Sequence, residues 1–304
     1  MLRQALQSIA KQTRLPDEVF ISDNSPEPDP GVVKEFPELP IRYHHKKDHL
    51  PPEQHWLWAI QQPQTEFISI LEDDNLYLPH HLQILFKVIS ENSSAVLAGS
   101  NALVFQNIPS NFSQPVFAPC WKINWLKSSL CRLIPRDAAL AAYLFGSPFA
   151  SSATLFRKEA LTACKLSPSR MAIAYDRWMW TQIVSKGDVL YCPEITVLYR
   201  DHPIQLVKNS SRAIHRADTR GCTKLIIAFI RKLGLSVEQV TADMCKEFSF
   251  QERVCFGLYV FKQRNLALCK LFLPILLPEL GFSRSMFFLS LRFLKDRLRE
   301  RVSV

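Results

Sequence analysis

The 304-residue chain carries 37 Lys and Arg against 28 Asp and Glu, and 47% of its residues are hydrophobic. This composition suits one large globular domain with an appendage and excludes a low-complexity chain. No apolar run approaches the ~20 residues of a membrane-spanning helix, and the first residues lack a signal-peptide layout. The eight cysteines form no C-x-x-C pair, which predicts reduced thiols in a cytoplasmic protein rather than a disulfide or zinc framework.

The first third of the chain alternates amphipathic helices with short apolar strands. Helix periodicity and turn residues predict helices over 2–12, 32–36, 53–62 and 79–90, and strands over 19–21, 41–44, 66–71 and 95–105. This alternation is typical of an α/β fold, with a Rossmann-like, mostly parallel sheet covered by helices on both faces.

The middle of the chain is less regular. Residues 106–133 contain prolines and tryptophans without a clear period, so we expect an irregular loop region that forms a wall of an acceptor pocket. Beyond it we predict a strand over 150–157, a helix over 175–185 and two short strands over 189–192 and 195–199.

Three consecutive carboxylates, Glu72, Asp73 and Asp74, follow the apolar run that ends at Leu71. Open α/β sheets bind their ligands where strands end, and hard divalent metals prefer carboxylate oxygens. A solvated acidic turn before the next helix is an equally common use of a bare acidic triplet. Its position directly after a strand favours a binding site.

Three further residues have an ordinary and a functional interpretation. Asp23, in Ser-Asp-Asn-Ser-Pro after a strand, can accept a hydrogen bond from a nucleobase imide or make an Asx-turn, and the turn is the commoner use. Asp176 lies at the start of a predicted helix, as an N-cap or as a general base. A single histidine such as His202 is usually a loop residue.

In this order, the segments resemble those of the family 2 glycosyltransferases, which have the GT-A fold and use nucleotide sugars. The resemblance covers residues 1–203. It rests on residues 16–25 (PDEVFISDNS), on 67–79 with its acidic triplet, on Tyr-Asp-Arg-Trp-Met-Trp at 175–180, and on Tyr-Arg-Asp-His at 199–202. One such match is weak, whereas four in order are specific for the fold.

The resemblance implies a role for each candidate residue. Asp23 would accept the N3–H of uracil, and Asp73 would contact the ribose or diphosphate. Asp74 would bind Mn²⁺ or Mg²⁺, with His202 as a second ligand. Asp176 would act as the catalytic base that deprotonates an acceptor hydroxyl during inversion at the anomeric carbon.

Two features depart from the family pattern. Asn75 stands where an Asp is frequent, and we expect it to act as an oxygen ligand or helix cap. Family members also begin with an apolar strand ahead of the first helix, and here Met1 already lies in that helix. A strand missing from the middle of the sheet would leave backbone groups of its two neighbours unpaired, at about 1–3 kcal/mol for each buried group. A misplaced start, a truncation or a damaged relative would each explain this.

The basic excess belongs to the last third, where residues 203–304 hold 18 Lys and Arg against 8 Asp and Glu. We expect residues 204–304 to be a mostly helical extension, with Arg212, Arg216, Arg220 and Lys224 on one helical face. The cationic amphipathic segment 292–299 suits an anionic membrane surface, and packing on the catalytic domain with a solvated basic face is equally compatible. No nucleic-acid-binding motif is present, so nucleic acid is not an expected partner.

These patterns leave three hypotheses. The first is an inverting, metal-dependent glycosyltransferase on the cytoplasmic side of a membrane, which transfers sugar from a UDP-sugar to a glycan or lipid-linked acceptor in surface polysaccharide synthesis. The second is a catalytically inactive, membrane-associated relative that binds sugars or partner enzymes. The third is a metal-dependent phosphate hydrolase, which the lack of further ligands disfavours.

Overall fold

The computed structural model describes residues 1–105, 129–164, 173–203, 205, 210–262 and 268–271. Its central sheet has the strand order β3-β7-β5-β8-β4, with β6 pairing β8 beside this path. The strands are β3 (Phe67–Ser69), β4 (Leu76–Tyr77), β5 (Ala95–Phe105), β6 (Arg132–Ile134), β7 (Thr154–Arg157) and β8 (Asp188–Arg200). A short 3₁₀ helix, η2 (Ser151–Ala153), leads directly into β7.

The expected α/β fold with a central sheet is confirmed, but the sheet is mixed rather than mostly parallel. The long strands β5 and β8 are parallel, as expected for strands joined by helical crossovers. β7 runs antiparallel to both β3 and β5, and the short strands β4 and β6 run antiparallel to β8.

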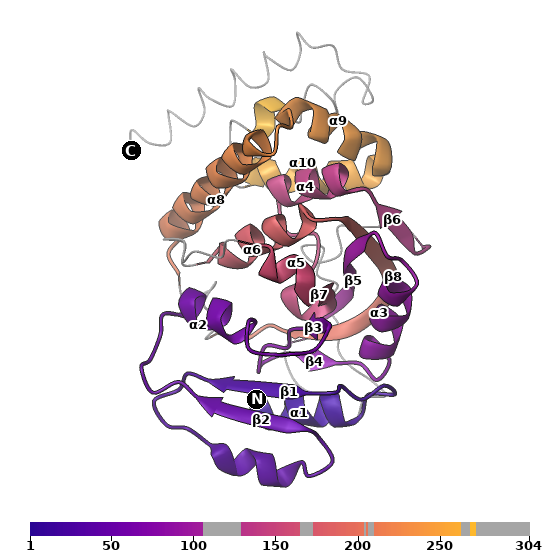
Figure 1. Cartoon of the computed structure of the whole chain (residues 1–304). Helices are drawn as coiled ribbons and strands as arrows, with labels where there is room; N and C mark the ends of the chain where they lie inside the picture. Colours follow the sequence, from indigo (N-terminus) through magenta and orange to yellow (C-terminus); the bar gives the residue numbers. More distant parts are fainter. Residues whose placement is uncertain (106–128, 165–172, 204, 206–209, 263–267, 272–304) are drawn as a thin grey trace.

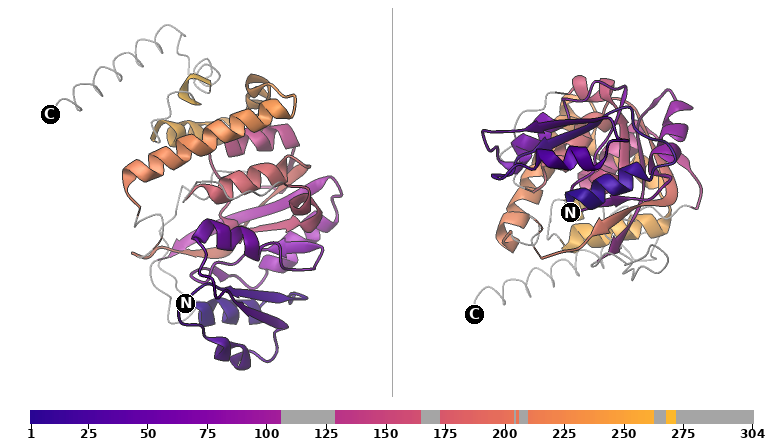
Figure 2. Two further views of the ribbon diagram at one scale, coloured as in Figure 1. Left: turned by 60° about the vertical axis from the view of Figure 1, so that its left-hand side comes forward. Right: turned by 90° about the horizontal axis from the view of Figure 1, so that it is seen from below.

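Helices cover both faces of the sheet (Figures 1 and 2). On one face, α3 (His81–Ser90) buries Leu85 and Ile89 against side chains of β5, β7 and β8. On the other face, α4 (Arg136–Phe145), α5 (Lys158–Thr162) and α6 (Tyr175–Val184) share the largest hydrophobic cluster. Consecutive β5 residues, Leu97 and Ala98, point to opposite clusters, as strand geometry requires.

A second, two-stranded parallel sheet lies beside the central one and contains β1 (Val19–Asp23) and β2 (Ile41–His45). The first helix, α1 (Leu2–Ala10), connects the two sheets. Its Leu6 packs with β1, while the Ser8 hydroxyl accepts a 3.1 Å hydrogen bond from the Tyr77 amide of β4. A 3₁₀ helix, η1 (Pro30–Glu35), and α2 (Pro52–Ala59) complete this part of the chain.

The helices beyond residue 203 pack on the helices that cover one face of the central sheet. They are α8 (Arg212–Lys232), α9 (Val237–Glu247) and α10 (Phe250–Lys262), and they form a layer over α4 and α6 (Figure 1). Cys222, Ile226 and Ile230 of α8 are fully buried in the cluster that also contains α4 and α6. Arg220 and Lys224 are exposed, so α8 packs on the core with a solvated basic face. The domain boundary after residue 203 stays a prediction.

Several expectations for the middle and end of the chain need revision. α4 and β4 were not predicted, β6 begins inside the segment expected to be irregular, and the two strands expected between 189 and 199 are one strand, β8, with bulges. Residues 106–128 and the amphipathic segment 292–299 lie outside the described residues. None of the described helices combines the length and the apolar character needed to cross a membrane.

Candidate functional site

A cavity of about 1000 Å³ separates β1 from β3. Its wall includes Val19 and Ile21 of β1, Ile68 of β3, and Leu6 of α1. Within the described part of the chain, β1 pairs only with β2, and β3 pairs only with β7. The cavity therefore lies between two strand edges that have no partner strand among the described residues. Asp23 and Asp73, which follow β1 and β3, both line it.

Asp23 makes the expected Asx-turn. Its Oδ1 accepts a 2.8 Å bond from the Ser25 amide, and its Oδ2 accepts a short bond from the Tyr43 hydroxyl. Burial acts to raise the pKa of Asp23, but the hydrogen bonds from Ser25 and Tyr43 outweigh it and hold the pKa below its usual value. His55 of α2 also lines the cavity, with its Nε2 2.5 Å from the Ser22 hydroxyl.

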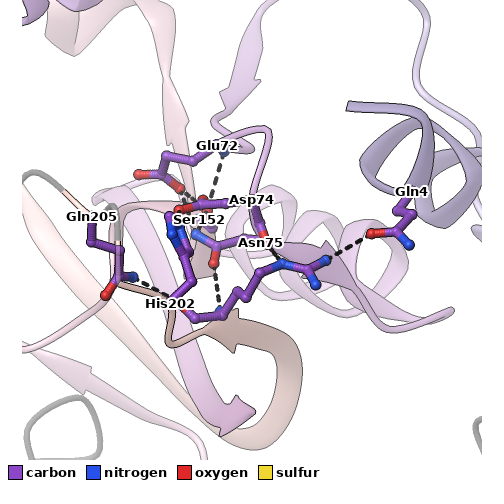
Figure 3. A network of polar contacts seen from close by, with 8 residues as sticks. Gln4, Glu72, Asp74, Asn75, Ser152, His202 and Gln205 are labelled. Carbon is purple, nitrogen blue, oxygen red and sulfur yellow. Dashed lines mark hydrogen bonds and ion pairs between the residues drawn. The ribbon is translucent and has the colours of Figure 1, made fainter. Parts of the chain in front are cut away.

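The acidic turn after β3 meets the end of β8. His202 Nε2 lies 2.9 Å from Asp74 Oδ2 (Figure 3). Asp74 Oδ1 and His202 Nδ1 are buried and have no hydrogen-bond partner among the described residues. A buried carboxylate oxygen without a partner is costly unless a cation or donor completes it. This orphaned oxygen, next to an imidazole, fits a divalent cation.

Asp74 and His202 can supply only part of a coordination shell. Within the described ranges, no third His, Cys, Asp or Glu lies close enough to both to complete a three-residue cluster. Mg²⁺-type sites commonly use one or two protein ligands and take the rest from water and substrate phosphates. Partial burial and the neighbouring Asp74 carboxylate raise the pKa of Asp73, which a bound cation would reverse.

Asn75 organises the acidic turn from within. It is 1% exposed, its Nδ2 donates to Glu72 Oε2 at 3.2 Å and to Ser152 Oγ at 3.1 Å, and its Oδ1 accepts from the Arg200 amide at 2.9 Å (Figure 3). Asn75 therefore does not cap the following helix, contrary to expectation, since the cap residue of α3 is His80. Burial raises the pKa of Glu72 to about 8, with a further contribution from the Asp74 charge.

Arg200, the last residue of β8, binds the backbone of the acidic turn. Its Nε donates to the Asp74 carbonyl at 2.7 Å, and its Nη2 donates to Gln4 Oε1 of α1 at 3.0 Å. The side chain is 7% exposed and lies over the Phe105 ring. The Tyr-Arg-Asp-His motif marked this position, but only the folded chain identifies the guanidinium as a clamp that joins α1, the acidic turn and β8.

Asp176 lies in the first turn of α6, but it is not the N-cap, because that position is Ala174. Its Oδ1 accepts a 2.6 Å bond from the Arg177 amide, and its Oδ2 has only a long, 3.5 Å contact with the Ser151 hydroxyl. The Trp180 indole N–H also donates to that hydroxyl, at 3.3 Å. Burial raises the pKa of Asp176, which makes it a better proton acceptor near neutral pH.

The neighbouring Arg177 fixes the start of α6. It is 4% exposed, and its Nε donates to the Tyr143 carbonyl of α4 at 2.6 Å. A second bond joins its Nη2 to the Leu144 carbonyl. The backbone that carries Asp176 is therefore held by the end of α4, a helix that sequence analysis did not predict.

The structure brings four of the five predicted residues to one region. Asp74 and His202 are in direct contact, and Asp73 adjoins them. Asp176 joins the group through the adjacent Ser151 and Ser152, of which Ser152 makes a short bond to Glu72. Asp23 stands apart on the β1 side of the cavity. The connection through η2 was not predicted, because two serines carry no recognisable motif.

Comparisons with known proteins agree with this architecture. A sequence profile described as "Glycosyl transferase family 2" matches residues 1–160. S. aureus TarS is similar in structure, with a TM-score of 0.52 and 16% identity over 85% of this chain and 46% of TarS. A structure of TarS residues 1–349 gives the same TM-score and identity over 80% of this chain and 66% of that one. The chain thus spans about half the length of TarS. No curated protein matched.

Proposed function

Because the chain belongs to glycosyl transferase family 2, we propose that it transfers a sugar from a nucleoside-diphosphate donor, a UDP-sugar, to an acceptor hydroxyl with inversion. The observation that supports this most strongly is that the Asp74–His202 pair and Asp176 are linked through a few short steps. Asn75, the neighbour of Asp74, and Ser152 of η2 both donate to Glu72, and Ser151, the neighbour of Ser152, contacts Asp176. A displacement at the anomeric carbon needs these two functions side by side: stabilisation of the leaving diphosphate and a base for the acceptor.

On the donor side, Asp74 and His202 would hold Mn²⁺ or Mg²⁺. Such a cation neutralises charge on a leaving diphosphate as a Lewis acid. Asp73 would contact the ribose or diphosphate, and Asp23 would accept the uracil imide N–H with a remaining lone pair. The backbone turn of Asp23 already fixes the direction of its carboxylate. Arg200 positions Asp74 by holding its carbonyl.

On the acceptor side, Asp176 would take the proton from the attacking hydroxyl. Its Oδ2 has only the long contact to Ser151 and can accept a stronger bond from a substrate hydroxyl. Its raised pKa leaves a more basic carboxylate than an ordinary aspartate. General-base catalysis of this kind typically contributes about 10²–10⁴ in rate. A single displacement forms no covalent sugar intermediate, so one base suffices.

We further propose a glycan or lipid-linked acceptor in cell-surface polysaccharide synthesis, on the cytoplasmic side of a membrane. The basic exposed face of α8 supports contact with an anionic membrane surface, because clustered Lys and Arg are attracted to anionic lipids. Nucleic acid is not a proposed partner.

The test is a screen of nucleotide sugars for release of nucleoside diphosphate, with added Mn²⁺ and with candidate acceptors. The parent chain should release diphosphate from one donor. Asp176→Asn should lower acceptor-dependent turnover by about 10²–10⁴-fold while still binding donor. Asp243→Asn is the matched control, since Asp243 forms only surface contacts on α9. Equal turnover in the Asp176→Asn variant and this control would refute the assignment of the base.

A second candidate function is that of an inactive relative that binds sugars or partner enzymes. The cavity between β1 and β3 favours it, because the cavity separates Asp23 from Asp73, two residues that would have to contact the same donor. If the parent chain binds neither UDP nor any nucleotide sugar in the presence of Mn²⁺, this second function replaces the first. If the parent chain binds a nucleotide sugar but transfers it to no acceptor, the result supports an inactive relative that still binds sugars.

A further inference from the structure

Two cysteines and a glutamate meet on the strand pair β6–β8, away from the site described above. The antiparallel register pairs Arg132 with Tyr191, so the next position outward places Cys131 opposite Cys192. Glu194 follows Cys192 by two residues, across a bulge of β8. The two sulfur atoms and a Glu194 carboxylate oxygen all lie within 4.8 Å of one another.

The position of this cluster separates it from the proposed sugar-transfer site. Cys192 precedes Arg200, the last residue of β8, by eight residues, which at about 3.3 Å per residue is roughly 25 Å of strand. β6 lies on the part of the sheet beside α4 and the helical layer (Figure 1). A ligand bound here would not touch Asp74 or His202.

The local backbone holds the cluster in place. Asn101 of β5 donates from Nδ2 to the Pro193 carbonyl at 2.8 Å and to the Tyr191 hydroxyl at 3.0 Å. These bonds fix the bulge of β8 between Cys192 and Glu194. On the other strand, Arg132 donates to Glu252 of α10 at 2.8 Å and to the Glu247 carbonyl at 3.0 Å. Both strands are thus anchored before any ligand binds.

The donor set selects a soft or borderline cation. Thiolates with one carboxylate are ligands for Zn²⁺, whereas Mg²⁺ and Ca²⁺ take oxygen ligands. In a tetrahedral zinc site with Zn–S bonds of about 2.3 Å, ligand atoms lie about 3.8 Å apart. The observed spacing reaches this with small side-chain rotations. Cys192 is buried, while Cys131 and Glu194 are exposed, so a cation can approach from solvent and rest on Cys192.

We propose that Cys131, Cys192 and Glu194 form a zinc site that staples β6 to β8, with water as the fourth ligand. Because Arg132 joins β6 to α9 and α10, the staple also fixes the helical layer against the sheet. Zinc requires deprotonated thiols, so binding releases protons and weakens at acid pH. This inference is independent of the proposed sugar-transfer function.

The test uses the full chain, purified under reducing conditions and stripped of metal with a chelator. Competition against a chromophoric zinc indicator should give one zinc per chain, and Co²⁺ should give a thiolate-to-cobalt charge-transfer band. Cys131→Ser and Cys192→Ser should each weaken zinc binding by more than about 100-fold, since even second-shell changes cost about 10–100-fold. Zinc should raise the melting temperature of the parent chain but not of Cys131→Ser.

Two controls make the result specific. Cys164→Ser removes a partly buried thiol whose one described hydrogen bond goes to the Ala160 carbonyl, a bond that serine can keep, so zinc binding should not change. Asp74→Asn should also bind zinc like the parent, which separates this site from a cation at Asp74. The exposed Cys131→Ser variant keeps the test usable if Cys192→Ser fails to fold. A reduced parent chain that takes up no zinc, or cysteine variants that bind it like the parent, would overturn the proposal.

Discussion

Asn75 offers a quantitative test of the network beneath the candidate site. Asn75→Ala removes two donated hydrogen bonds and one accepted bond, and it leaves the buried Arg200 amide without its partner. A typical hydrogen bond contributes about 0.5–1.5 kcal/mol, and an unsatisfied buried group costs about 1–3 kcal/mol. Because the side chain is 1% exposed, water cannot substitute easily. We therefore expect a loss of about 3 kcal/mol in the free energy of unfolding.

The measurement is urea unfolding followed by circular dichroism, without added divalent metal. The midpoint should fall while the slope with urea stays constant, which indicates a change in stability alone. Gln7→Ala, on the exposed side of α1, is the control and should change stability by less than about 0.5 kcal/mol. A loss below about 1 kcal/mol for Asn75→Ala would refute the account of Asn75 as the centre of the network.

Exchanging the amide and the acid between positions 75 and 72 tests the hydrogen bond that Asn75 donates to Glu72. Asn75→Asp keeps an acceptor for the Arg200 amide but removes the amide that donates to Glu72. This variant should lose stability, and adding Glu72→Gln should recover part of the loss, because the new amide can donate to the new carboxylate. Absence of any recovery in the double variant would show that the Glu72–Asn75 bond is not the energetic link.

Other predictions follow from the same geometry. Transfer needs the ionised Asp176 carboxylate, whose pKa is raised, so turnover should increase with pH at a value above the usual range for aspartate. A pH profile of turnover whose acid side follows an ordinary aspartate would contradict this. Arg200→Met should lower the free energy of unfolding by about 1.5–3 kcal/mol in urea, through loss of the charged bond to the Asp74 carbonyl; an unchanged midpoint would contradict the clamp. Gly99→Ala would bring a Cβ within 2.5 Å of the buried Phe149 ring and should lower the free energy of unfolding by about 1–3 kcal/mol, measured by thermal melting. Adding Phe149→Leu should restore part of this stability. An equally low melting temperature in the double variant would contradict the clash.

The elements predicted from the sequence were those with a clear period or position. α1, α3 and α6 have apolar residues on one side, and β1 and β3 are apolar runs bounded by turns. α4 was missed because its residues from Ala138 to Phe145 are all buried, so no polar face marks it as a helix. A helix that is apolar on all sides is buried between layers of a core. α4 is such a helix, because the helical layer packs over it, and this packing could not be predicted from its own residues.

The candidate site also contains residues that could be predicted from the sequence and residues that could not. Asp23, Asp74 and Asp176 follow or begin regular elements, so their motifs could be recognised in the sequence. The residues that hold them could not, because their contacts join positions far apart in the chain: Asn75 with Ser152, and Arg200 with Asp74. The direction of strand β7 was likewise undetermined, since an apolar strand carries no signal for parallel or antiparallel pairing.

The most direct test of the proposed function is calorimetric binding of UDP to the full chain with and without Mn²⁺. If Asp74 and His202 hold a cation against the diphosphate, UDP should bind in the presence of Mn²⁺ and at least tenfold more weakly without it. Asp74→Asn should remove this dependence, while the surface control Asp243→Asn keeps it. Binding of UDP that is the same with and without Mn²⁺, or unchanged in Asp74→Asn, would contradict a metal-dependent donor site on this acidic turn.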